Sequence, residues 1–360
     1  MKQKTLIILS CTAILISSLA AMIAPALAAD NTGPLNLTTS PVPIDLAGLP
    51  GTTLSTDLRI KNNSPQTEKL KVTLMKFSAY GNTGKPALAE RAPGDNYFDW
   101  VSFSPSSFDA PTEVWITVKM TIKMPKDAAL GYYYAVVFSR ASNPAATPGE
   151  RQNLIIGSTA VMVLVEAQVP GAKRTAQLVD FSTDHRSYEF LPANFSITLH
   201  NSGNVHFVPH GDIFITRGKS QIADLRINTG QGNILPGTNR VFTASWSDGF
   251  PVYVDKVTDG KTVKDKQGNQ VKTLQWNFSH IQKLRFGHYT AHLLMVYDNG
   301  QRDVPIEATV SFWVIPWRVV GISLIALTLI GAGSWSISRS TWRRVKKVQT
   351  KETQQKIWKE

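Results

Sequence analysis

The chain has 360 residues, a single cysteine and a formal net charge of +12 at pH 7. Residues 1–28 hold two of the 38 basic residues, and residues 317–360 hold nine of them and two of the 26 acidic residues. Subtracting these eleven basic and two acidic residues leaves 27 and 24, a net charge of +3 for the segment between. The positive charge is therefore concentrated at the two ends, and we expect no nucleic-acid partner.

Residues 1–28 are predicted to be a secretory signal peptide. Lys2 and Lys4 precede a long apolar run that ends in Ala26-Leu27-Ala28, which is a typical cleavage signal. An uncleaved anchor is the alternative. Cys11 lies early in the apolar run, so it does not fit a lipoprotein cysteine. The exported chain then has no disulfide and depends on its hydrophobic core, which favours a bacterial protein.

Residues 29–170 are predicted to form the first of two immunoglobulin-like β-sandwich domains. Apolar and polar side chains alternate in residues 115–124 (WITVKMTIKM) and again in residues 70–77 (LKVTLMKF), as in half-buried strands. Residues 158–169 (STAVMVLVEAQV) are apolar on both faces, which predicts a central strand. No helical pattern occurs before residue 317, so the fold class is all-β.

A domain boundary is expected in residues 167–177 (AQVPGAKRTAQ), where the strand pattern stops at a Pro-Gly turn. Residues 171–315 then form the second β-sandwich. The tetrapeptide LPGT occurs at 49–52 and 235–238 and resembles the start of a sortase signal, but each copy precedes a strand pattern. Pro followed by Gly suits a type II turn, so we expect two turns. Their recurrence suggests that the two domains share a sandwich plan.

Residues 247–276 are polar and lysine-rich and contain two turn signals, at Asp259-Gly260 and at Gln267-Gly268-Asn269. This pattern predicts a β-hairpin inserted into the second domain. Two roles stay open for it, a solvated excursion or an arm that contacts a partner.

All seven histidines lie between residues 185 and 292, and two of them, His206 and His210, fall in residues 201–211 (NSGNVHFVPHG). His288 and His292 share one face of a predicted strand, about 13 Å apart. A zinc–nitrogen bond is about 2.1 Å long, so these two residues cannot bind one ion from a straight strand. We therefore expect no metal and no cofactor.

The usual catalytic motifs are missing. Residues 217–220 (RGKS) resemble the end of a phosphate loop, but Ile213 stands where its leading glycine is needed. The mature chain has no cysteine for thiol chemistry. A non-catalytic protein is expected, although a glycosidase-type pair of carboxylates about 5–10 Å apart would not be visible in the sequence.

Residues 316–338 are predicted to be a transmembrane helix. The uncharged segment 319–337 has 19 residues, which span about 28 Å as a helix. Trp313 and Trp317 lie at its entry and Trp342 beyond its exit, as interfacial aromatics do. The tail, 339–360, begins with the basic residues Arg339, Arg343, Arg344, Lys346 and Lys347. Basic tails stay cytoplasmic, so the prediction is a single-pass cell-membrane protein with its N-terminal region extracellular.

Three stretches of the first domain resemble one known family. They are SPVPIDLAGLPGTTLSTDLRIKNNS, FDWVSFSPSSFDA and VKMTIKMPKDAALGYYYAVVFS, and they are similar to the DUF916-type N-terminal domain of the WxL-interacting proteins. The resemblance covers most of residues 40–140. It implies an exported protein with two immunoglobulin-like domains, a membrane helix and a basic tail. The family's first domain is described as binding peptidoglycan and its second as binding partner proteins.

A second stretch, from Asn201 through Gly203 and Asn204 into the next strand, resembles a turn in β-sandwich modules of bacterial surface proteins. No ligand residue of either resemblance can be carried over. Tyr132, Tyr133 and Tyr134 are candidate ligand contacts, because consecutive strand residues alternate and an outward ring can stack on a sugar.

Together these features predict a membrane-anchored cell-surface protein that binds peptidoglycan or a wall-bound surface protein. A cell-wall hydrolase accessory is one alternative. A chaperone-like adaptor that works by strand addition is another, and it predicts an exposed edge strand. A sensor that signals through its tail is a third.

Overall fold

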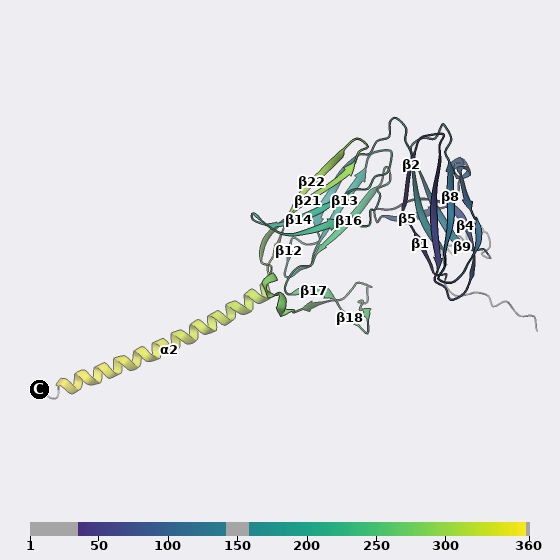
Figure 1. The fold of residues 1–360 in the computed structure, drawn as a ribbon. Helices are drawn as coiled ribbons and strands as arrows, with labels where there is room; N and C mark the ends of the chain where they lie inside the picture. Colours follow the sequence, from purple (N-terminus) through teal and green to yellow (C-terminus); the bar gives the residue numbers. More distant parts are fainter. Residues whose placement is uncertain (1–34, 142–157, 358–360) are drawn as a thin grey trace, which may run out of the picture.

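The structure, a computed structural model, describes residues 35–141 and 158–357. These residues form two β-sandwiches followed by one long helix that projects away from the second sandwich (Figure 1). The predicted fold class, all-β with two immunoglobulin-like domains and a C-terminal helix, is therefore confirmed. The predicted signal peptide, 1–28, lies outside the described residues.

The first domain consists of two sheets and a short 3-10 helix. One sheet has four strands in the order β1 (Leu37–Ser40), β3 (Thr53–Asn62), β8 (Trp115–Lys123) and β6 (Val101–Ser104). The other has the order β2 (Ile44–Gly48), β10 (Thr159–Ala167), β9 (Gly131–Arg140), β4 (Glu68–Tyr80) and β5 (Lys85–Ala89), and β7 (Ser107–Ala110) also pairs with β4. The 3-10 helix is η1 (Asn96–Trp100).

The alternation predicted for this domain is confirmed. In β8 the buried side chains are Val118, Met120 and Ile122, whereas the residues between them point to solvent or are only partly covered. Burying the apolar set removes it from water and is the main source of the sandwich's stability. The strand β10, apolar on both faces, is central as predicted, because it lies between β2 and β9.

The second domain also has two sheets. The three-stranded sheet has the order β11 (Ala176–Thr183), β13 (Ala193–Asn201) and β16 (Asn239–Trp246). The five-stranded sheet has the order β12 (Ser187–Tyr188), β22 (Asp303–Val314), β21 (Gly287–Asp298), β14 (His210–Arg217) and β15 (Ser220–Ile227). Its core is built around Trp246, Tyr289 and Phe312, whose rings pack against one another.

The predicted inserted hairpin is confirmed. Between β16 and β21 the chain forms two small antiparallel sheets, β17 (Val252–Asp255) with β20 (Lys272–Gln275) and β18 (Val257–Thr258) with β19 (Lys261–Thr262). A second 3-10 helix, η2 (Phe278–Lys283), follows and leads back to β21. The insertion therefore extends past residue 276, almost to Gly287.

The two domains share a plan. In each, the first strand divides between the two sheets, and its second part pairs parallel with the domain's last strand: β2 with β10, and β12 with β22. Both LPGT segments form turns, with Gly51 and Gly237 at positive φ. They precede strands in different places, however, since β3 lies between two strands and β16 is an edge. The repeated tetrapeptide therefore does not mark equivalent positions.

A buried asparagine at the end of β3 marks a position that is equivalent in the two domains. Asn62 is fully buried, and its Nδ2 donates hydrogen bonds to the carbonyl oxygens of Gln66 and Ala110, at 2.8 and 2.9 Å. Its Oδ1 accepts from the backbone N–H of Ser64 at 2.9 Å. One side chain thus closes a turn and ties it to a second loop.

Asn201, at the end of the corresponding strand β13, repeats this arrangement. It is fully buried, donates to the carbonyl oxygens of Val205 and Ile234, both at 2.9 Å, and accepts from the N–H of Gly203 at 2.9 Å. Buried backbone groups need such partners, so both domains depend on the same polar residue at the same place.

The C-terminal helix α2 (Trp317–Ile357) begins three residues after β22 ends. Its apolar part, Trp317–Trp342, is long enough to cross a membrane by length and composition. The helix does not stop at residue 338 but runs on through the predicted tail. Residues 339–357 contain no glycine or proline and many Lys, Arg and Gln, which favour helix.

Asn201→Ala should destabilise the second domain by roughly 3 kcal/mol, because it removes three hydrogen bonds to backbone groups and leaves the carbonyl oxygen of Ile234 with only the N–H of Phe207 as a partner. Urea unfolding followed by tryptophan fluorescence measures this. Asn239→Ala is the matched control, since Asn239 is exposed in the same domain and should cost less than about 0.5 kcal/mol. Equal losses from the two variants would show that Asn201 does not have the role described.

Candidate functional site

The second domain docks on the outer face of the first domain's larger sheet, the one that contains β10. Polar contacts at three places join them among the described residues. The His206 ring Nε2 lies 3.1 Å from an Asp45 carboxylate oxygen, and Arg174 pairs with Glu166 at 2.5 Å. The backbone N–H of Val241 donates to the carbonyl oxygen of Asn82 at 2.8 Å. These contacts come from the turn after β13, the linker and the start of β16, so they hold the second domain at three separate points.

His206 is the most buried of these groups, with only 3% of its surface exposed. Its ring packs edge-on against Tyr133, with the ring centroids 5.6 Å apart. Burial raises the pKa of the Tyr133 phenol, against a smaller opposing effect of the His206 backbone. The His206 and Tyr133 pair therefore belongs to an interface between the domains. His210 lies apart from it at the exposed start of β14.

Elsewhere in the stretch 201–211, Asn204 forms hydrogen bonds with the linker between the two domains. The Asn204 N–H donates to the carbonyl oxygen of Lys173 at 2.9 Å, and the Lys173 N–H donates back to Asn204 Oδ1 at 2.6 Å. Asn204 Nδ2 also donates to the carbonyl oxygen of Gly171 at 2.9 Å. The turn predicted at Asn201–Asn204 therefore fixes the path of the chain between the domains.

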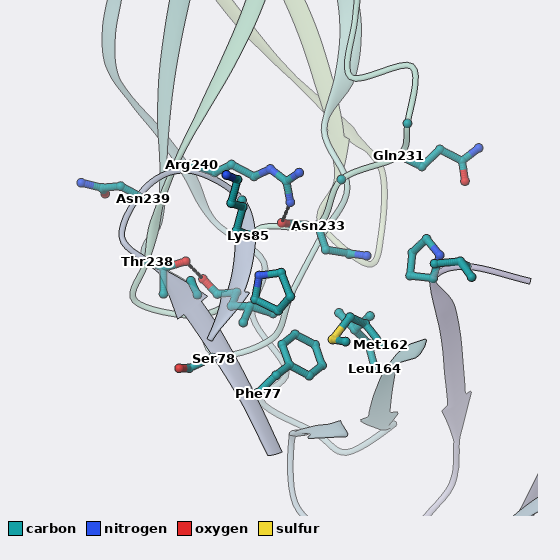
Figure 2. Close-up of a pocket in the computed structure, with 18 residues that line it drawn as sticks. Phe77, Ser78, Lys85, Met162, Leu164, Gln231, Asn233, Thr238, Asn239 and Arg240 are labelled. Carbon is teal, nitrogen blue, oxygen red and sulfur yellow. Dashed lines mark hydrogen bonds between the residues drawn. The ribbon is translucent and has the colours of Figure 1, made fainter. Parts of the chain in front are cut away.

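A cavity of about 250 Å³ lies between the domains (Figure 2). Phe77, Met162 and Leu164 line it from the first domain, and the second domain contributes the loop before β16 together with Arg240. The guanidinium of Arg240 donates to the carbonyl oxygen of Asn233 at 2.7 Å, and burial lowers its pKa. The lining contains no carboxylate and no imidazole, so it offers no acid–base pair.

The three candidate tyrosines occupy different places. Tyr134 is fully buried, and its hydroxyl donates to the carbonyl oxygen of Tyr97. Tyr132 is half-buried and packs on the rings of Tyr97 and Trp100. Tyr133 faces the second domain, as described above. All three rings therefore pack against protein.

The opposite face of the first domain is open. On β1, β3, β8 and β6 the outward side chains are polar or charged apart from one tryptophan, and they are mostly exposed. This open face comprises Thr38, Ser40, Ser55, Asp57, Arg59, Ser102, Ser104, Trp115, Thr117, Lys119 and Thr121. Trp115 is 39% exposed, and the guanidinium of Arg59 lies 5.0 Å from its ring centre. The sequence pattern identified Trp115 as outward but did not distinguish it as a binding residue.

Carboxyl groups with shifted pKa values do not suggest acid catalysis. The pKa is lowered in each of them, because hydrogen-bond donors outweigh burial: Asp95, Asp99, Asp184, Asp248 and Asp265. A catalytic acid needs a raised pKa. Within residues 35–141 and 158–357 there is also no group of three or more His, Cys, Asp or Glu that could hold a metal ion.

Two strand edges bear on the strand-addition alternative. In β22 only Trp313 and Val314 pair with β12, but the free side before them carries Asp303, Pro305 and Glu307, which protect an edge from pairing. In β10 the pairing with β2 starts at Val163, so Thr159–Met162 have no partner strand on that side in the described part of the chain.

The predicted membrane-interface residues lie at the two ends of the apolar part of α2. Trp313 is the penultimate residue of β22 and packs on His288, Trp317 is the first residue of α2, and Trp342 ends its apolar part. Arg339 lies within the apolar part's last turn. The side chains of Arg343, Arg344, Lys346 and Lys347 lie outside the described ones, although their backbone is helical.

No family model and no curated protein matches the chain. It is similar to solved structures that include the class 5 fimbriae chaperone CfaA, at 16% identity and a TM-score of 0.31 over 68% of this chain and 100% of that chain. The CsuC–CsuE chaperone–tip adhesion subunit pre-assembly complex of Acinetobacter baumannii is another, at 10% identity and a TM-score of 0.33 over 76% and 97% of the chains. At these values, the similarity carries no conclusion about binding. The resemblance to WxL-interacting proteins stays a prediction.

Gly84→Ala should displace the Arg240 guanidinium from its hydrogen bond with Asn233, at the contact between the domains. A methyl group there would lie 2.6 Å from the Arg240 guanidinium carbon. Gly81→Ala is the matched control, because both glycines have positive φ in the same turn but nothing lies near Gly81. Each alanine should cost the first domain about 1 kcal/mol. Only Gly84→Ala should also shift the backbone NMR signals of Asn233 and Arg240, and equal shifts in both variants would contradict this.

Acid should loosen the attachment of the insertion. The hydrogen bond from Lys283, helped by the charge of Arg285, lowers the pKa of Asp248 against a smaller opposing effect of burial. The ionised carboxylate thus adds stability above its unfolded pKa of about 3.9, and this stability is lost as the pH falls through the lower folded-state pKa. Hydrogen exchange of the Phe250 N–H, which donates to the carbonyl oxygen of Lys283, measures this loss of stability as a function of pH. Asp248→Asn should abolish this pH dependence, so that the exchange protection of the Phe250 N–H no longer changes as Asp248 would titrate.

Proposed function

We propose that this chain is a non-catalytic cell-surface binding protein, anchored by α2, whose first domain attaches to cell-wall peptidoglycan or to a protein bound there. The observation that carries the proposal is the unequal use of the first domain's two sheet faces. One face is occupied by the second domain, through His206, Arg174 and the cavity around Arg240. The other, the open face, has no partner strand or domain over it within the described residues.

The chemistry of the open face suits a polar polymer. Serine and threonine hydroxyls can donate and accept hydrogen bonds with sugars, and Trp115 can stack on a sugar ring. Arg59, Lys119 and the nearby Lys61 and Lys123 outnumber Asp57 and Glu113 around it. A slightly basic face favours polymers with carboxylate or phosphate groups. Trp115 takes the role of the ligand contact for which the three tyrosines were candidates.

The position of α2 supports the topology. Its apolar part can cross a membrane, and the basic residues that begin at Arg339 follow it. Basic residues after a membrane span favour a cytoplasmic tail, and both sandwiches would then lie outside the cell. The first domain, farther along the chain from α2, would then face the wall.

A second candidate function is strand addition, supported by the unpaired half-edge of β10. An extended segment of a partner protein could bind along Thr159–Met162 through backbone hydrogen bonds. Binding of this kind would protect the amides of these four residues from hydrogen exchange, whereas binding on the open face would leave them unchanged.

Trp115→Ala in the ectodomain, residues 29–315, should weaken co-sedimentation with isolated cell walls. Loss of one stacking ring costs about 1 kcal/mol, roughly a fivefold loss of affinity. Tyr80→Ala is the control, since Tyr80 is an exposed aromatic ring of the same domain outside the open face. Removing the whole first domain would be less informative, because it would also expose the docking surface of the second domain.

Cell walls stripped of protein distinguish the two proposed ligands, the wall polymer and a wall-bound protein. Binding of the unmodified ectodomain to stripped walls identifies the polymer, and binding only to untreated walls identifies a wall-bound protein. If neither wall preparation binds it, or if Trp115→Ala and Tyr80→Ala behave alike, the open face is not the wall-binding site.

A further inference from the structure

The segment from Trp276 to Phe286 exposes an unusual amount of apolar surface. Trp276, Phe278 and Ile281 are 49%, 67% and 55% exposed, and Leu284 and Phe286 follow at 43% and 49%. Five large apolar side chains within eleven residues form a patch that a water-exposed surface does not normally keep. We call these five residues the apolar segment.

The apolar segment lies at the end of the second domain from which α2 leaves. Phe286 directly precedes Gly287, the first residue of β21, and Gly287 pairs with Val314, the last residue of β22. Trp317 begins α2 three residues later. Figure 1 shows the short helix of this segment beside the start of α2. The segment is thus placed by strand register and not by a flexible connection.

A chain of polar contacts joins the insertion to α2 itself. The hydroxyl of Tyr253, on β17, lies 3.5 Å from a carboxylate oxygen of Glu189. The other carboxylate oxygen of Glu189 lies 3.4 Å from the guanidinium of Arg318, the second residue of α2. The insertion and the first turn of the helix therefore share one half-buried carboxylate.

The apolar segment is held firmly at its base. Asp248 pairs with Lys283 and Arg285, and the Phe250 N–H donates to the carbonyl oxygen of Lys283 at 3.0 Å. Below the surface, the Phe250 ring packs on those of Trp276 and Phe278, at 5.7 and 5.5 Å. The exposed side chains are therefore presented by an ordered frame and cannot fold inward without breaking it.

We propose that the apolar segment inserts into the surface of the membrane that α2 crosses, so that the second domain rests on the bilayer. Aromatic and aliphatic side chains interleaved with Lys283 and Arg285, and with no acidic residue between 276 and 286, are the composition of an interfacial anchor. The inference rests on α2 being a membrane helix. It adds a second contact that fixes the tilt of the ectodomain over the membrane.

Fluorescent labels at single cysteines test this in the full chain, with Cys11→Ser, reconstituted into anionic lipid vesicles. Phe278→Cys reports on the apolar segment, Ile325→Cys on the middle of α2, and Tyr80→Cys on the first domain; all three side chains are exposed in the protein. Interfacial insertion of about 5–10 Å places a label at position 278 beside nitroxides attached near the lipid headgroups. Deeper nitroxides should quench the label at 325, and neither lipid should quench the label at 80.

Each result has a distinct meaning. Loss of emission at 278 with shallow nitroxides supports the proposal, and emission equal to that at 80 overturns it. A label at 278 shielded from lipid and from aqueous quenchers alike shows cover by a second copy or another protein, which also overturns it. If the label at 325 is not quenched, α2 is not in the membrane, and the anchor in the proposed function fails instead.

Phe278→Ser together with Ile281→Ser provides a check that does not depend on a label. Both side chains are more than half exposed, and the ion pairs of Asp248 with Lys283 and Arg285 remain, so the fold should be kept although the Phe278 ring no longer packs on Phe250. The distribution of tilt of the ectodomain relative to the bilayer should become broader in electron microscopy of the protein in lipid nanodiscs. An unchanged distribution of tilt would contradict the proposal.

Discussion

The arrangement of this molecule depends on one contact, the docking of the second domain on the outer face of the β2–β10–β9–β4–β5 sheet. Strand β10 has apolar side chains on both faces because both are covered, one by its own sandwich and the other by the second domain. His206, Arg174 and the backbone of Val241 add directional contacts to this apolar surface. Since apolar burial has no preferred orientation, these polar groups define how the domains sit.

Fixing one face of the first domain determines what its other face can do. The open face of β1, β3, β8 and β6 stays accessible because the second domain cannot reach it. The second domain is fixed in turn by the start of α2, through Glu189 and Arg318. If the apolar segment also rests on the bilayer, the ectodomain has two points of support, and the direction of the open face relative to the membrane is determined.

Sequence alone predicted the fold well where the physics is local. The alternation in Trp115–Lys123, the Pro-Gly turns and the inserted hairpin depend on neighbours in the chain, and each is found. The roles of Tyr133 and His206 could not be predicted, because they depend on contacts between residues far apart in the sequence: Tyr133 packs on His206, and His206 lies 161 residues from Asp45. The turn at Asn201–Asn204 was predicted as a turn, but its hydrogen bonds with the linker between the domains were not predicted.

The exposure of the apolar segment also could not be predicted from the sequence alone. Its residues look like part of a core in the sequence, since Trp, Phe, Ile and Leu are usually buried. Only the register of β21 with β22 places them beside α2, where exposure to a membrane is favourable. Likewise, Asn62 and Asn201 carry the common plan of the two domains, although nothing in their flanking residues matches closely enough to reveal it.

The most direct measurement is photo-crosslinking on intact cells, with a crosslinking amino acid at Thr117 on the open face and, as control, at Asp180 on the exposed side of β11. Attachment through the open face predicts high-mass adducts at Thr117 that a glycan-cleaving enzyme releases, and few at Asp180. Equal yields at the two positions, or no adduct at Thr117, would contradict a wall-binding first domain.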